Sequence, residues 1–209
     1  MEKQYDSILF DLDGTLWDAT DVVRDAWNKS ASQFQEVDYE VSTEDIMGVM
    51  GQLIPDIARI LYPKLSDSQR EILVNETIVI EQEVLNRQGA ILYEGLEETL
   101  KELSRQYKLC VVSNCQSGYI ESFLNAHHLE KYFTDFECPG NTGLLKGDNI
   151  KLVCERNGFK NPIYVGDTAK DAEAAQYAGV PFVFAAYGFG KVENYDYIIQ
   201  DIRELKDLF

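Results

Sequence analysis

Two aspartates near the start of the chain are spaced so that they could do chemistry together. Asp11 and Asp13 directly follow an apolar, strand-like run, Ile8-Leu9-Phe10. Because side chains alternate along an extended backbone, both carboxylates are expected on the same side of it. Gly14 then lets the chain leave the strand in a conformation that other residues resist. Two adjacent carboxylates repel each other unless a cation or a shared proton lies between them, so the pair predicts a functional site. The alternative is a turn in which both carboxylates are solvated.

Further polar groups lie near the ends of other predicted strands. They are Ser113 and Asn114 at the end of the strand at 109–113, Asp167 and Asp171 after the strand at 163–165, and Lys146 in a loop at 142–147. A parallel sheet brings the carboxyl ends of its strands to one edge. We therefore expect these groups to meet Asp11 and Asp13 there.

The charges at this edge predict a particular chemistry. Carboxylates without histidine or cysteine favour a hard cation, and oxygen ligands suit Mg²⁺. A phosphoryl group beside the metal would need more positive charge and donors, which Lys146, the Ser113 hydroxyl and nearby amides could supply. One carboxylate can attack phosphorus, and a second, two residues on, can protonate the leaving oxygen and later deprotonate water.

The chain from Ala19 to Gln88 has a helical pattern without a strand. Helices are expected from about 20 to 35, from a capping box at Ser42 and Asp45, from Pro55, and from a second capping box at Ser66 and Gln69 to about Asn86. These roughly 70 residues form a compositional unit of their own.

From Ala90 onward, helices and strands alternate. Strands are expected at 109–113, 133–138, 163–165 and 182–185, and helices at 94–106, at 117–124 with Ser117 as its cap, at 149–157 and at 170–178. This alternation predicts an α/β fold, with a Rossmann-like parallel sheet and helices on both faces.

Composition excludes several classes of partner. The 209-residue chain has 19 basic and 36 acidic residues and a formal net charge of −17, so it is a poor candidate for binding nucleic acid. No apolar run approaches the roughly 20 residues that span a bilayer. The four cysteines form no C-x-x-C pair and are expected to be free thiols in a reducing compartment. Because the N-terminus also lacks the pattern of a signal peptide, we predict a cytoplasmic protein.

The polar groups, taken in order, resemble the four motifs of the haloacid dehalogenase-like (HAD) hydrolase superfamily. The motifs are Asp11-Leu12-Asp13-Gly14-Thr15, Ser113-Asn114, Lys146 and Gly166-Asp167 with Asp171. The resemblance covers essentially the whole chain. The helical stretch looks like the C1 cap of phosphoglycolate-phosphatase-like members. The resemblance therefore implies a HAD-like core at 1–18 and 89–209 and a helical cap at 19–88.

The first motif carries the reaction in this superfamily. By resemblance, Asp11 is the nucleophile and a Mg²⁺ ligand. Asp13 is the general acid/base, and its backbone carbonyl binds the metal. Dehalogenases and phosphonate hydrolases of the superfamily lack an Asp at the second position, so Asp13 implies phosphate-ester chemistry.

The other motifs imply supporting roles. Ser113 and the Asn114 amide would hold the phosphoryl oxygens, and Lys146 would neutralise them and orient Asp11. Asp167 would ligate Mg²⁺, and Asp171 would support the metal from the same loop. Lys170 is an alternative lysine, although it is expected to face solvent.

The predicted function is Mg²⁺-dependent hydrolysis of a small phosphorylated metabolite through an aspartyl phosphate, with no other cofactor. A β-phosphoglucomutase-like mutase would use the same residues, with the phosphorylated enzyme donating to a sugar instead of water. A receiver-like phospho-Asp switch also places an Asp, a Ser or Thr and a Lys on a parallel sheet. The switch needs neither a cap nor a general acid, so the helical stretch and Asp13 argue against it.

Overall fold

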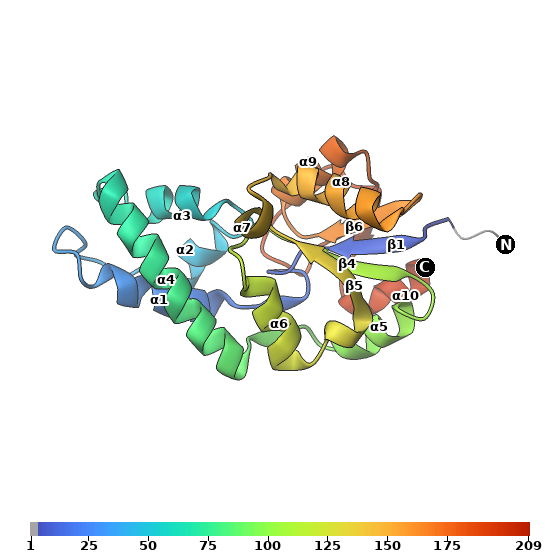
Figure 1. The fold of residues 1–209 in the computed structure, drawn as a ribbon, viewed down its shortest axis with the longest axis horizontal. Helices are drawn as coiled ribbons and strands as arrows, with labels where there is room; N and C mark the ends of the chain where they lie inside the picture. The colour runs from blue at the N-terminus through green and yellow to red at the C-terminus, as the bar shows by residue number, and fades with distance from the viewer. Residues whose placement is uncertain (1–3) are drawn as a thin grey trace.

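The computed structural model describes residues 4–209. A six-stranded parallel sheet lies at the centre of their fold (Figure 1). The strands, in their order across the sheet, are β5 (Phe133–Glu137), β4 (Lys108–Val112), β1 (Ser7–Phe10), β6 (Pro162–Gly166), β7 (Phe182–Ala185) and β8 (Tyr197–Ile199). The predicted α/β fold with a parallel sheet is therefore confirmed. Residues 1–3, which belong to the predicted core range and to the N-terminus searched for a signal peptide, lie outside the described part.

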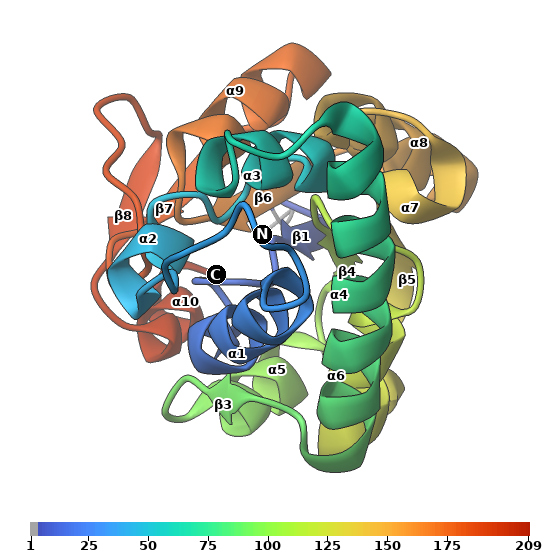
Figure 2. The ribbon, with the colours of Figure 1, turned by 90° about the vertical axis from the view of Figure 1, so that its left-hand side faces the viewer.

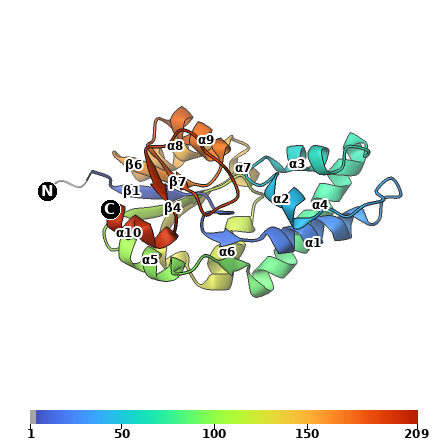
Figure 3. The ribbon, with the colours of Figure 1, turned by 180° about the vertical axis from the view of Figure 1, so that it is seen from behind.

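Helices cover both faces of the sheet. One face carries α8 (Lys146–Asn157) and α9 (Ala169–Ala178), and the other carries α5 (Leu96–Leu103), α6 (Tyr119–His127) and α10 (Leu205–Leu208) (Figures 1 and 3). In β1, Leu9 packs with the α8 and α9 side, whereas Ile8 and Phe10 pack with the opposite side. The strand is therefore buried on both faces, which is why it reads as a continuous apolar run. Short elements complete this part: α7 (Pro139–Thr142) and two 3₁₀ turns (Glu130–Tyr132 and Ile202–Glu204).

Four helices lie beyond the carboxyl ends of the strands, and we call them the inserted helices. They are α1 (Thr20–Ala31), α2 (Thr43–Met47), α3 (Ile54–Leu61) and α4 (Asp67–Gln88). Figure 2 shows them in front of the end of β1, with the long α4 on one side. Both predicted capping boxes are present, since Ser42 and Ser66 each exchange hydrogen bonds with the residue three positions on. Along its length α4 packs against α1, α3 and the core helix α6.

A two-stranded antiparallel ribbon joins the two chain passages that lead into and out of the inserted helices. It consists of β2 (Trp17–Asp18) and β3 (Ile91–Leu92). Two-residue strands are too short to show an alternating pattern, so the sequence does not predict them. β8 was missed as well, because only three residues form it.

Several predicted boundaries are wrong. Lys146 is the first residue of α8 and does not lie in a loop; Leu145 occupies the N-cap position without a side-chain capping bond. Glycine suits position 147 because α8 packs closely on α9. A Cβ on Gly147 would lie 2.6 Å from the Tyr177 ring. Ser117 does not cap α6, since Gly118 holds that position with a φ of 90° that favours glycine. Helix α1 ends at Ala31, earlier than predicted.

Two further features of the described residues concern membrane-spanning helices and cysteines. Between residues 4 and 209, no helix is both long and apolar enough to cross a membrane. All four cysteines are free; Cys110, Cys115 and Cys138 are buried and Cys154 is half-buried.

An ion-pair network fixes α8, and with it Lys146, to the sheet. Arg156 donates two hydrogen bonds to the Asp135 carboxylate, from Nε and from Nη2, each at 2.6 Å. Its Nη1 donates to Glu137 Oε1 at 2.7 Å. Burial alone would raise the pKa of Asp135, but hydrogen bonds from Arg156 and Asn157 outweigh it and hold the pKa below its usual value.

We expect Arg156→Leu to lower the free energy of unfolding by about 1–2 kcal/mol at pH 7, because a partly exposed bidentate pair is lost. A carboxylate with a depressed folded-state pKa stabilises the fold above its unfolded pKa, and this contribution is lost as the pH falls. The difference between variant and wild type should therefore shrink below about pH 4. Urea unfolding at pH 7 and pH 3.5 measures both values. An equal difference at the two pH values would contradict the assignment to Asp135.

Candidate active site

Three of the predicted site residues lie directly beyond adjacent strands of the sheet. Asp11 follows β1, Ser113 follows β4, and Asp167 follows β6. All three are buried. The Asp11 backbone N–H donates to the Val165 carbonyl at 2.8 Å, which continues the ladder between β1 and β6. The carboxyl edge of the sheet therefore positions these groups through its backbone.

Lys146 lies between two of the carboxylates. Its Nζ is 2.9 Å from Asp11 Oδ1 and 2.6 Å from Asp171 Oδ1. Only 3% of the Lys146 side chain is exposed. Burial disfavours the charged ammonium, but the two carboxylates outweigh burial and raise the pKa of Lys146 above its usual value. The lysine is therefore a fixed cation.

Asp171 is held by the first turn of α9. Its Oδ2 accepts from the backbone N–H of Thr168 at 2.9 Å and from the Thr168 hydroxyl at 2.6 Å, as part of a capping box. Its Oδ1 faces Lys146. One aspartate thus starts a helix and orients the lysine.

Asp11, Asp167 and Asp171 each present an oxygen within 4.8 Å of the others'. With one lysine among three buried carboxylates, the cluster carries an excess of negative charge. Burial, followed by the charge of Asp171, raises the pKa of Asp11 to about 6 and raises that of Asp167 well above its usual range. An oxygen-only cluster with unbalanced negative charge fits a hard divalent cation such as Mg²⁺.

Backbone closes tightly around Asp167. Gly14 has a φ of 77°, and a Cβ there would lie 2.2 Å from Asp167 Oδ2. A Cβ on Gly188 would lie 2.3 Å from the Asp167 Cβ. The Phe189 N–H donates to Asp167 Oδ2 at 2.7 Å. Gly14 is therefore required both by its left-handed backbone and by its contact with this carboxylate.

The Asp13 carboxylate is not part of the three-carboxylate cluster, although it lines the same cavity as Asp11. Its Oδ1 accepts from the Trp17 indole N–H at 2.9 Å and from the Tyr119 hydroxyl at 3.0 Å. The chain leaves β1 at Phe10, so strand alternation no longer controls this side chain. Burial, followed by the charge of Asp11, raises the pKa of Asp13 to about 7. Asp13 can therefore hold or release a proton near neutral pH.

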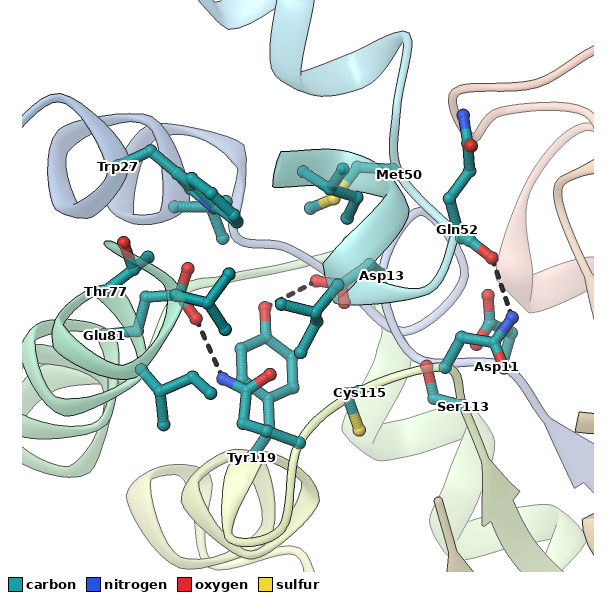
Figure 4. A pocket seen from close by; sticks show the side chains of 18 residues that line it. Asp11, Asp13, Trp27, Met50, Gln52, Thr77, Glu81, Ser113, Cys115 and Tyr119 are labelled. Carbon is teal, nitrogen blue, oxygen red and sulfur yellow. Dashed lines mark hydrogen bonds between the residues drawn. The ribbon is translucent and has the colours of Figure 1, made fainter. Parts of the chain in front are cut away.

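The structure also places the second motif. The Ser113 side chain lies beside the Asp11 carboxylate, where its hydroxyl lowers the pKa of Asp11 and partly offsets the effect of burial (Figure 4). The Asn114 side chain instead reaches the inserted helices, where its Nδ2 donates to the Gly51 carbonyl at 2.8 Å. Asn114 thus connects the sheet edge to the loop between α2 and α3. The predicted alternative lysine, Lys170, lies exposed and pairs with Glu173 at 2.8 Å.

A cavity of about 40 Å³ separates the sheet edge from the inserted helices (Figure 4). Asp11, Asp13 and Ser113 line its floor, while α1, α3, α4 and the loop at Met50–Gln52 line the opposite side. Asp11 and Ser113 lie together in Figure 4, and Asp13 points toward Tyr119.

Among the cavity residues that sequence reasoning missed are Glu81, Gln116 and Tyr119. Glu81 belongs to the buried stripe of α4, in which Leu73, Thr77, Glu81 and Leu85 recur every four residues. A glutamate inside such a stripe is the signal that could have identified it. Tyr119 and Gln116 have no comparable signal, because their roles depend on where α6 packs.

Comparisons with known proteins agree with this architecture. A family model described as haloacid dehalogenase-like hydrolase matches residues 8–185. A phosphoglycolate phosphatase of Aliivibrio fischeri is 26% identical over 89% of this chain and 86% of its own length. The pyrophosphatase PpaX of Oceanobacillus iheyensis is 24% identical over 95% of this chain and 94% of its own.

A solved structure has the same fold. That of a predicted phosphoglycolate phosphatase from Haemophilus somnus 129PT superimposes with a TM-score of 0.88, at 21% identity, over 100% of this chain and 99% of the other. The family match covers the sheet from Ile8 of β1 to the end of β7, the inserted helices and every residue of the carboxylate cluster. The chain therefore belongs to the haloacid dehalogenase-like hydrolase family, and it is an enzyme.

Proposed function

We propose that the protein hydrolyses a small phosphomonoester in a Mg²⁺-dependent reaction through a phosphorylated Asp11. The observation that carries the proposal is that Asp11 and Asp13 lie in different surroundings. Asp11 lies in the carboxylate cluster beside Lys146, whereas Asp13 lies outside it with a pKa near 7. One is suited to remain ionised as a nucleophile and the other to exchange a proton.

The phosphoryl group would bind above Asp11. Lys146 supplies a buried positive charge, and the Ser113 hydroxyl supplies a donor next to the same carboxylate. The Asn114 backbone amide would add a second donor. Mg²⁺, held by Asp11, Asp167, Asp171 and the Asp13 carbonyl, would add positive charge that stabilises the charge developing on the phosphoryl oxygens. Lys146, Ser113 and the Asn114 amide would orient the phosphorus toward the Asp11 carboxylate.

The reaction would proceed in two steps. An oxygen of Asp11 attacks phosphorus, the bond from phosphorus to the alcohol oxygen breaks, and protonated Asp13 donates its proton to that oxygen. Asp13, now a carboxylate, removes a proton from water, whose oxygen attacks phosphorus. The bond from phosphorus to Asp11 breaks, releasing phosphate and restoring both aspartates.

The inserted helices would act as a lid over this chemistry. We propose a core at 1–18 and 89–209 and a cap at 19–88, with the β2–β3 ribbon at the boundary. The small cavity supports a small phosphorylated metabolite as substrate, because α1, α3 and α4 leave little space above Asp11 and Asp13.

Hydrolysis of para-nitrophenyl phosphate with Mg²⁺ and with EDTA tests the proposal. We expect turnover with Mg²⁺ and a loss of at least about 100-fold in EDTA, since an unbalanced carboxylate cluster would repel the substrate. Adding excess Mg²⁺ back should restore the rate. Turnover that EDTA leaves unchanged would contradict the metal assignment. Transfer of phosphate from a sugar bisphosphate to the monophosphate, without release of free phosphate, would instead favour a mutase.

A further inference from the structure

The Asp13 side chain is held by two hydrogen bonds that end on the same oxygen. The Trp17 indole N–H donates to Asp13 Oδ1 at 2.9 Å, and the Tyr119 hydroxyl is 3.0 Å from that atom (Figure 4). An indole N–H can only donate, so Oδ1 is an acceptor in this arrangement. Asp13 lines the cavity together with Asp11, so its carboxyl group is held at the site of the proposed reaction.

Aromatic packing fixes both donors. Trp17 is fully buried, and its ring meets the rings of Tyr119 and Phe123 edge to face, with centroids 5.6 and 5.2 Å apart. Tyr119 is 3% exposed and is the first residue of α6. Because buried rings are closely packed, the indole N–H and the phenol hydroxyl keep fixed positions.

The backbone around Asp13 is closed into a compact turn as well. The Gly14 N–H donates to the Trp17 carbonyl at 2.9 Å, and the Trp17 N–H donates to the Leu12 carbonyl at 3.3 Å. Trp17 also belongs to β2, which pairs with β3. The main chain and the two aromatic side chains therefore hold Asp13 in one place relative to Asp11, two residues earlier.

The two hydrogen bonds favour one oxygen of Asp13 for proton exchange. In a carboxylic acid the carbonyl oxygen is the better acceptor, and the other oxygen carries the proton. Two hydrogen bonds to Oδ1 therefore favour Oδ2 as the protonated oxygen. After Oδ2 has given up its proton, Oδ1 of the carboxylate still accepts both bonds. The same arrangement thus suits both protonation states that the reaction requires of Asp13.

Building on the proposed phosphatase function, we propose that Tyr119, together with Trp17, is a positioning residue that holds Asp13 by Oδ1 so that Oδ2 exchanges the proton with the leaving oxygen. When the bond from phosphorus to the alcohol oxygen breaks, its electron pair stays on that oxygen, which takes the proton from Oδ2. In the second step Oδ2 accepts a proton from the attacking water. Tyr119 and Trp17 keep their own protons throughout.

Two aryl esters of similar shape test this role, because their leaving groups differ in basicity. para-Nitrophenolate leaves readily without a proton, whereas phenolate is a stronger base and gains more from protonation. Tyr119→Phe removes the hydroxyl and keeps the ring. We expect kcat/KM to fall about tenfold or more for phenyl phosphate and to change by less than about threefold for para-nitrophenyl phosphate.

The ratio of the two kcat/KM values separates positioning from a structural role. A smaller fraction of folded protein would lower both values by the same factor and leave the ratio unchanged. An unchanged ratio in Tyr119→Phe would therefore overturn the proposal. A ratio that moves in favour of phenyl phosphate would overturn it too, because the hydrogen bond would then hold Asp13 away from the leaving oxygen.

A double-mutant cycle tests whether Tyr119 acts through Asp13. In an Asp13→Asn background, Tyr119→Phe should change kcat/KM for phenyl phosphate by less than about twofold. A further loss of about tenfold would contradict the proposal, because Tyr119 would then act independently of Asp13.

Tyr132→Phe is the matched control. It also removes a tyrosine hydroxyl that bonds a carboxylate, since the Tyr132 hydroxyl donates to Glu97 Oε1 at 3.0 Å, but this bond is exposed. The ratio of the two kcat/KM values should equal that of wild type.

The outcomes separate this proposal from the proposed function. If the wild-type protein hydrolyses neither ester with Mg²⁺, the phosphatase function itself is rejected. If it hydrolyses para-nitrophenyl phosphate alone, or if Tyr119→Phe leaves the ratio unchanged, the positioning role is rejected and the phosphatase function stands.

Discussion

Asp11→Asn is expected to lower kcat for para-nitrophenyl phosphate by about 10⁴-fold or more while the protein stays folded. The amide cannot form the bond to phosphorus, and no second carboxylate of the cluster occupies its place at the end of β1. The geometry of the site should change little, because asparagine has nearly the same shape. Steady-state release of para-nitrophenol measures the effect.

The same substitution should increase stability in the absence of metal. A carboxylate whose folded-state pKa is raised destabilises the fold at every pH above its unfolded value, because the charged form is disfavoured in the native state. The pKa of Asp11 is raised to about 6 by burial and then by Asp171. At pH 7 to 8 in EDTA, Asp11→Asn should therefore gain about 1–3 kcal/mol. The gain should disappear below about pH 4, where the carboxyl group is protonated in both states.

A surface substitution of the same kind provides the control. Asp207→Asn changes an exposed aspartate of α10, far from the carboxylate cluster in the sequence, and should leave both activity and stability as in wild type. Substantial turnover by Asp11→Asn would mean that Asp11 is not the nucleophile. A loss of stability at pH 7 would mean that its buried charge is fully compensated without a metal.

Lys146→Met is expected to reduce both activity and stability. Methionine fills a similar volume but removes the cation that faces Asp11 and Asp171. Removing one partner of a buried ion pair leaves its carboxylates uncompensated, which typically costs about 3–5 kcal/mol. Loss of a positive charge from the phosphoryl site should lower kcat/KM by about 10²–10³-fold.

Lys170→Met is the matched control for this experiment. Lys170 lies on α9 and pairs with Glu173, but its side chain is exposed. Exposed pairs contribute about 1 kcal/mol or less, so this variant should remain close to wild type in stability and rate. Urea unfolding in EDTA and the para-nitrophenyl phosphate assay compare the two. Mg²⁺ should restore part of the stability of Lys146→Met by neutralising the carboxylates. If Lys170→Met has the larger effect, the lysine assignment is wrong.

The sequence by itself determined the parts of this protein that depend on neighbours in the chain. Continuous apolar runs such as Ile8–Phe10 identify strands covered on both faces, because every side chain of such a strand is buried. The capping boxes at Ser42 and Ser66 were predictable, since each needs only residues three positions apart. The motif aspartates could also be placed near strand ends, because the apolar runs that predict those strands precede them in the chain.

The tertiary structure alone decided which of these groups touch. Tyr119 and Asp13 are 106 residues apart in sequence, and Asn114 and Gly51 are 63 apart. No local pattern encodes either hydrogen bond. Lys146 starts α8, although the sequence predicts a loop at 142–147, and α8 packs closely on α9 at Gly147.

Glu81 shows most clearly what local spacing determines and what tertiary packing decides. The four-residue spacing places it on the buried face of α4, but the pattern does not say what that face covers. Only the docking of α4 over α6 brings Glu81 to Gln116 and into the cavity above Asp13. Spacing along a helix fixes which face a side chain lies on, whereas its partner and its chemistry depend on long-range packing.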